Sequence, residues 1–173
     1  MDPSIDSKTS QCDNTPMNTL IVYYSRTGTN EKLALEAGER LMAQVEKLID
    51  KNKREGFFSF LRCGFDAARK KLTKLAPLTN DPKDFELVVL ATPLWAGSLP
   101  PAARTFLAEQ RNKLNKLALI SISGIGAGNK KVMADIEKTL AKKPAAALLL
   151  TRKEFADKSY QAKLKTFLSS LPS

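Results

Sequence analysis

Residues Thr19 to Ala34 read TLIVYYSRTGTNEKLA, and this stretch decides the fold. Its first six residues, Thr19 to Tyr24, are apolar, aromatic or β-branched, which is typical of a buried strand. Ser25 to Asn30 then bring hydroxyls and a glycine, which favour a loop and the cap of a helix. Apolar side chains follow on one helical face, at Leu33, Ala34, Ala37 and Leu41. The stretch therefore predicts a strand, a short loop and a helix over about 30–42.

The same alternation continues along the chain. Further strand-like runs lie at 44–49, 86–91, 117–122 and 146–150, and helical spacing marks 57–75, 102–110, 130–142 and 158–171. Strands that alternate with helices predict an α/β domain, in which helices cover a five-stranded parallel sheet. We assign this domain to residues 18–173, because residues 1–17 are polar and predict a disordered N-terminal tail.

The composition excludes several chemistries. The 173 residues hold 28 lysines and arginines against 18 acidic residues, a formal net charge of +10, with two cysteines and no histidine. Without histidine there is no Ser-His-Asp or Cys-His nucleophile and no histidine-containing zinc site. Two cysteines form no four-cysteine metal site, and they fit a reducing, cytoplasmic setting. The N-terminus does not have the pattern of a secretory signal, and no apolar run is long enough for a membrane span.

Three loops follow three of the predicted strands, where such a sheet binds its ligand. Ser25 to Asn30 offers hydroxyls, a glycine and a helix start, which suit a phosphate, although an ordinary capped turn has the same residues. Thr92 to Gly97 carries the chain's one tryptophan, Trp95, which either stacks on a planar ligand or packs under its loop. Ser123 to Gly128 is glycine-rich, so its backbone can approach a ligand closely.

The glycine spacing of the third loop excludes two common nucleotide sites. Its glycines run G-x-G-x-G, and Lys130 is neither in the register of a P-loop nor followed by serine or threonine. A dinucleotide fingerprint and a Walker A site are therefore both unsupported. A phosphate loop, a stacking aromatic and a backbone-rich loop instead favour a ligand with one phosphate and a planar heterocycle, the shape of flavin mononucleotide (FMN).

Two segments carry a resemblance to the flavodoxin family. Ile21 to Ala34 is similar to the family's phosphate-loop signature, and Asp84 to Gly97 resembles the segment that flanks the flavin ring. The resemblance implies a three-layer α/β/α flavodoxin-like fold with strand order 2-1-3-4-5 and FMN as the cofactor. It implies FMN-binding roles for three sets of residues: Ser25, Arg26, Thr27, Gly28, Thr29 and Asn30; Thr92, Pro93, Leu94, Trp95, Ala96 and Gly97; and Ser123, Gly124, Ile125, Gly126 and Gly128.

The sequence departs from the family pattern at two places. Asn30 stands where the signature ends in threonine, and because asparagine is a good helix cap we expect binding to survive, with some loss of affinity. The third loop has no second aromatic residue to sandwich the flavin, which leaves one face of the ring open.

The expected function is electron transfer by an FMN-binding redox protein. Two alternatives stay open: an FMN-dependent oxidoreductase that passes a hydride from a nicotinamide to a quinone-like acceptor, and a flavodoxin-like binding module that has lost FMN. No side chain stands out as a catalytic acid or base. The family's carriers are commonly acidic, so the net charge of +10 points to a different, acidic redox partner protein or to a small quinone-like acceptor.

Residues Lys51 to Lys74 concentrate charge and aromatic residues. They hold eight cationic and two acidic side chains together with half of the eight phenylalanines. On the predicted helix Phe57 and Phe65 share the apolar stripe, whereas Phe58 and Phe60 point elsewhere. These two either pack back onto the sheet or form a contact with a partner, a membrane surface or a quinone. The segment is not typical of a nucleic-acid reader, so we expect no nucleic acid.

Overall fold

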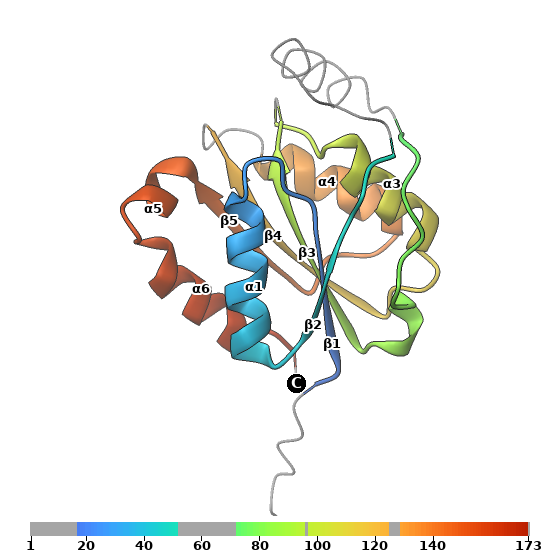
Figure 1. The fold of residues 1–173 in the computed structure, drawn as a ribbon, viewed down its shortest axis with the longest axis horizontal. Coiled ribbons are helices and arrows are strands. Elements are labelled where there is room, and N and C mark those ends of the chain that lie inside the picture. Colours follow the sequence, from blue (N-terminus) through green and yellow to red (C-terminus); the bar gives the residue numbers. More distant parts are fainter. Residues whose placement is uncertain (1–16, 52–71, 96, 125–128, 173) are drawn as a thin grey trace, which may run out of the picture.

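The computed structural model describes residues 17–51, 72–95, 97–124 and 129–172 (Figure 1). Strands and helices alternate along these residues. They are β1 (Thr19–Tyr23), α1 (Thr29–Leu41), β2 (Gln44–Lys47), the 3-10 helix η1 (Pro82–Asp84), β3 (Leu87–Leu94), α3 (Pro101–Gln110), β4 (Lys116–Ser123), α4 (Asn129–Leu140), β5 (Ala146–Thr151), α5 (Arg152–Ala156) and α6 (Tyr160–Ser169).

The five strands form one parallel sheet in the order β2-β1-β3-β4-β5, which confirms the predicted topology. β1 lies between β2 and β3, with Leu20 opposite Gln44 on one side and Val88 on the other. The chain therefore moves outward to β2 and then crosses back over β1 to β3. This reversal of direction lies between β1 and β3, and the loops after both strands emerge there (Figure 1).

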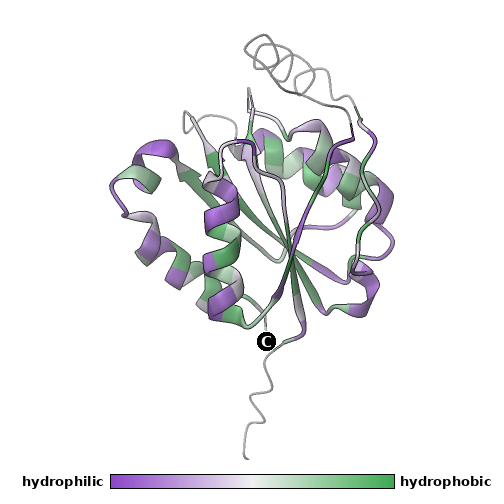
Figure 2. Ribbon diagram, viewed as in Figure 1, coloured by the Kyte–Doolittle hydropathy of each residue, from purple (hydrophilic) through white to green (hydrophobic). Residues whose placement is uncertain are grey.

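Each face of the sheet has its own apolar core. Because side chains alternate along a strand, Leu20 and Val22 point to one face and Ile21 and Tyr23 to the other. The first set packs in a cluster with residues of α3 and α4, among them Phe106. The second set packs with residues of α1 and α6. Figure 2 shows the result, since the inner strands are hydrophobic, the edge strand β2 is largely hydrophilic, and the helices carry hydrophilic residues on their outer sides.

β3 and α5 differ from the sequence-based prediction. β3 continues to Leu94, three residues past the predicted end, because Thr92 to Leu94 pair in register with Ser121 to Ser123 of β4. The short helix α5 was not predicted, and it begins at a capping box in which Thr151 and Glu154 bond each other's backbone N–H groups. The extension of β3 depends on its pairing with β4, and α5 depends on a single capped turn. The apolar periodicity of the sequence indicates neither of them.

The prediction of a helix over 57–75 is wrong at its C-terminal end. Residues 72–75 are not helical, and Leu72, placed on the predicted apolar stripe, is 58% exposed. Leu75 instead forms an antiparallel bridge with Asp50, next to a hydrogen bond from Lys51 N to Lys74 O of 2.8 Å. Thr73 N also donates to Thr105 Oγ1 of α3 at 2.9 Å. The rest of that helix, with Phe57, Phe58, Phe60, Cys63 and Phe65, and the tail over 1–16 lie outside the described residues.

Gly38 of α1 allows the helix to pack closely against β2. A Cβ atom at this position would collide with Val45 Cγ2, closer than real carbon atoms approach each other. Gly38→Ala therefore destabilises the fold by about 1–3 kcal/mol through overpacking, although alanine favours helices. Urea denaturation measures the change, and Glu39→Ala, on the exposed side of the same helix, serves as the control within about 0.5 kcal/mol of wild type. A Gly38→Ala variant as stable as wild type would contradict this packing.

Candidate functional site

The loop between β1 and α1 leaves the start of the helix open. Gly28 is the N-cap residue and adopts a left-handed conformation with a φ of 80°, which favours glycine. It provides no side-chain cap, and no described atom lies within 4 Å of the position a Cβ would take. The first N–H groups of a helix have no acceptor within the helix, and its dipole favours negative charge there. This end of α1 therefore suits an anion such as a phosphate.

Two polar atoms beside this helix start have no hydrogen-bond partner among the described residues. They are Ser25 Oγ and Asn30 Oδ1, and both are shielded from solvent. Asn30 is only 3% exposed as a whole. A buried polar atom without a partner costs about 1–3 kcal/mol, so such atoms are uncommon unless a ligand bonds them. Ser25 and Asn30 thus fit a group that brings several hydrogen-bonding oxygens, as a phosphate does.

Glu31 places a carboxylate in the first turn of α1, where it would repel an anion. Its side chain is held to one side, because Tyr23 donates a hydrogen bond to Glu31 Oε1 at 2.8 Å and Lys47 Nζ lies 3.7 Å from the same oxygen. Burial, this hydrogen bond and the negative charge of Glu31 raise the pKa of Tyr23 to about 12. The phenol therefore stays protonated and keeps donating at neutral pH.

The loop after β3 forms a narrow turn around Trp95. Trp95 and Ser98 exchange two backbone hydrogen bonds of 2.9 Å, and Gly97 has a φ of 66°. The indole is half-buried and meets the ring of Tyr24 edge-on, with centroids 5.8 Å apart. The guanidinium carbon of Arg26 lies 5.8 Å from the centroid of the Trp95 ring. The loops after β1 and β3 are therefore in contact through these three side chains.

The loop after β4 begins beside the same site. Ser123 is buried at the end of β4, in register with Leu94 of β3 and Thr151 of β5. Gly124 is exposed and lies close to the side chain of Arg152 at the start of α5. The predicted site residues Ile125, Gly126 and Gly128, like Ala96 of the second loop, lie outside the described residues.

Comparison with solved structures identifies the architecture. A flavoprotein in complex with FMN from Lactobacillus acidophilus NCFM superposes with a TM-score of 0.67, at 18% identity over 86% of this chain and 99% of the other. The Streptococcus pneumonia TIGR4 flavodoxin gives 0.51, at 16% identity over 88% and 96%. Two-electron reduced Megasphaera elsdenii flavodoxin gives 0.50, at 18% identity over 88% and 98%.

The chain has a flavodoxin-like fold. This confirms the fold that the two sequence motifs implied. No protein-family model matches the sequence, and no curated protein does either.

Within the flavodoxin-like domain, the described residues of the three predicted loops meet at one edge of the sheet. Among them, Asn30, Thr92, Leu94 and Ser123 are buried, whereas Arg26 to Gly28 are exposed. Thr92 is fully buried, accepts a hydrogen bond from Ser121 Oγ at 2.6 Å through its carbonyl, and thus ties β3 to β4. Its backbone therefore helps to hold the sheet beneath the loop.

Ser98 is a site residue that the sequence did not single out. It is 1% exposed, and its Oγ has no hydrogen-bond partner among the described residues. In the sequence, Ser98 follows the Trp95 to Gly97 motif as an unremarkable turn residue. Only the structure shows that Ser98 pairs with Trp95 across the turn.

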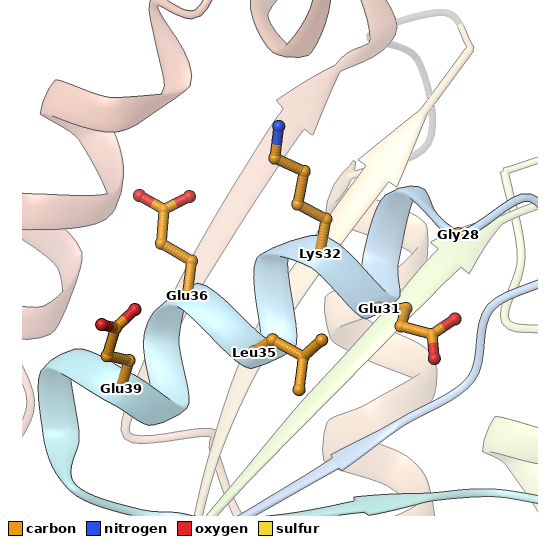
Figure 3. Close-up of a pocket in the computed structure, with 6 residues that line it drawn as sticks. All are labelled: Gly28, Glu31, Lys32, Leu35, Glu36 and Glu39. Carbon is orange, nitrogen blue, oxygen red and sulfur yellow. The ribbon is translucent and has the colours of Figure 1, made fainter.

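A shallow hollow of about 500 Å³ lies along the outer face of α1 and touches the site only at Gly28 (Figure 3). Leu35, 53% exposed, forms its apolar part. Figure 3 shows Glu31 pointing to the opposite side of α1 from Glu36. The other lining residues are Lys32, Glu36 and Glu39, so the hollow is an open helix surface of mixed charge.

Two absences hold for the described residues. Among them, no three histidine, cysteine, aspartate or glutamate side chains gather into a possible metal site. None of the helices in the same part of the chain is both long and apolar enough to cross a membrane.

The hydrogen bond from Tyr23 to Glu31 makes stability depend on alkaline pH. Since the pKa of Tyr23 is raised from 10.0 to about 12, its contribution is complete below pH 10.0 and is lost as the pH rises toward about 12. Tyr23→Phe therefore lowers the free energy of unfolding at pH 8, and the difference from wild type shrinks above pH 10. Urea denaturation at several pH values measures it. A difference that stays constant through this range would contradict the assigned pKa.

Proposed function

We propose that the protein binds FMN at the edge formed by the loops after β1, β3 and β4, and that it acts in electron transfer. The observation that carries the proposal is the uncapped start of α1 beside two unpartnered buried atoms, Ser25 Oγ and Asn30 Oδ1. The half-buried Trp95 lies in the neighbouring loop and offers a flat apolar surface. The Lactobacillus acidophilus relative, of the same fold, is described in complex with FMN.

Each part of the site has a role toward this cofactor. Ser25 and Thr27, with the N–H groups at the start of α1, would hold the phosphate. Trp95 would border the flavin ring, and the peptide at Gly97 would offer it a backbone hydrogen bond. FMN supplies the redox chemistry when bound, while the protein sets its position and surroundings. Electron transfer needs no protein acid or base, in keeping with a sequence that contains no histidine.

We also propose that the redox partner is acidic. Exposed cationic residues gather around the carboxyl ends of the strands, at Lys51, Lys74, Lys130, Arg152 and Lys153. Two acidic groups of this edge, among the residues that the structure describes, have partners within the protein. Asp50 accepts a hydrogen bond from Thr73 Oγ1 at 2.6 Å, and Glu154 bonds both Thr151 and Lys163. A positive rim of this kind attracts an anionic partner and speeds its association.

Titration with FMN tests the proposed function. Purified protein, stripped of any bound flavin, is expected to bind FMN and to quench the emission of Trp95, the only tryptophan. Thr27→Ala weakens FMN binding by about 1–3 kcal/mol, because a hydrogen bond to the phosphate is lost. The affinity for riboflavin stays unchanged, because riboflavin has no phosphate. Thr166→Ala, on the exposed face of α6, is the matched control. A wild-type protein that binds no FMN would refute the proposal.

The flavin-loaded protein also separates a carrier from an enzyme. Rapid mixing with NADPH leaves a carrier oxidised, whereas fast bleaching of the flavin would favour the FMN-dependent oxidoreductase instead.

The acidic-partner proposal predicts a salt dependence. Flavin-loaded, reduced protein is mixed with ferricyanide, an anion, and with hexaammineruthenium(III), a cation. Between about 10 and 200 mM salt the rate with ferricyanide falls several-fold and the rate with the cation rises, because salt screens attraction and repulsion alike. The Arg152→Glu and Lys153→Glu double variant reduces both effects, whereas Lys116→Glu, at the opposite end of β4, serves as the control. Equal salt effects for the two oxidants would contradict a positive rim.

A further inference from the structure

We propose that the Ser98 hydroxyl is a further FMN-binding group, contacting the ribityl phosphate arm; this inference rests on the proposed function. Ser98 stands outside the residues that the flavodoxin resemblance assigned. Four observations support it: the unpartnered hydroxyl, the side of the turn on which it lies, the neighbours on that side, and the similar atoms in the loop after β1 and at the start of α1.

The hydroxyl of Ser98 is buried without a partner. The residue is 1% exposed, and its Oγ neither donates nor accepts a hydrogen bond among the described residues. Ser121 offers a direct comparison, because it is also 1% exposed but donates to Thr92 O at 2.6 Å. The sheet therefore satisfies one buried serine and leaves the other, at the site, without a bond.

The pairing of the turn fixes the side on which Ser98 lies. Trp95 and Ser98 form an antiparallel bridge and exchange both backbone hydrogen bonds. Side chains of directly paired antiparallel residues lie on the same face of the ladder, about 5 Å apart. The hydroxyl of Ser98 is thus beside the indole of Trp95.

On that face, Trp95 meets the loop after β1. Its ring contacts Tyr24 edge-on, and Arg26 lies over it. Ser25, between these two residues, holds another unpartnered buried oxygen. The loops after β1 and β3 thus each hold a serine hydroxyl without a hydrogen-bond partner among the described residues.

Two other side chains near the site hold an unpartnered buried atom. Ser25 lies in the loop after β1, and Asn30 lies in the first turn of α1.

The inference predicts opposite effects of one substitution on stability and on binding. In the ligand-free protein, Ser98→Ala removes an unsatisfied hydroxyl, so its melting temperature is equal to or higher than that of wild type. Ser121→Ala, the matched variant, removes a hydroxyl that is bonded and lowers the melting temperature. A structural role for Ser98 would instead make both variants less stable.

In the same experiment, Ser98→Ala binds FMN about tenfold more weakly than wild type, the size of one lost charge-assisted hydrogen bond. Riboflavin locates the contact, since an equal loss for riboflavin places it on the ribityl chain and a loss confined to FMN places it on the phosphate. Unchanged FMN affinity, or a melting temperature lowered as in Ser121→Ala, overturns the inference while the proposed function stands. A wild-type protein that binds no FMN overturns both.

Discussion

The pairing of β1 with strands on both sides is the constraint on which the rest of the structure depends. Every residue of β1 is buried. β1 pairs with β2 on one side and with β3 on the other. A strand buried on both faces and both edges has one usable register, because a shift by one residue would exchange its two apolar sets. Tyr24, the next residue, still donates to Ala91 O at 2.9 Å, so the register extends to the start of the loop.

This fixed register makes the edge of the sheet a suitable place for a binding site. β1 and β3 are long enough to hold their ends rigidly, while the loops that follow contain residues whose hydrogen-bonding capacity the fold leaves unused. Such residues cost stability in the ligand-free protein, and function is the usual reason that a protein keeps them. The paired strands therefore fix the position of the site, and the loops supply its unpartnered hydrogen-bonding groups.

The sequence predicted the sheet well because β1, β3 and β4 are almost entirely buried. Runs such as Leu87 to Ala91 are recognised as buried strands by their apolar composition. The order of the strands follows from the motifs in the loops at their ends. Features that depend on single contacts were not predictable. The Leu75 pairing with Asp50 and the unsatisfied hydroxyl of Ser98 leave no trace in apolar periodicity. For the site, sequence motifs located the loops, but only the structure distinguishes Thr92, which supports the sheet, from residues at the rim.

The bridge between Asp50 and Leu75 has a consequence for how the chain can vary. Backbone bonds from Lys51 to Lys74 and from Ala76 to Ile49 join the two ends of an excursion that begins just after β2. Since these ends are already held together, the entropy of closing the excursion depends only slowly on its length. The domain can therefore accept longer or shorter inserts between these two residues without altering the register of the sheet.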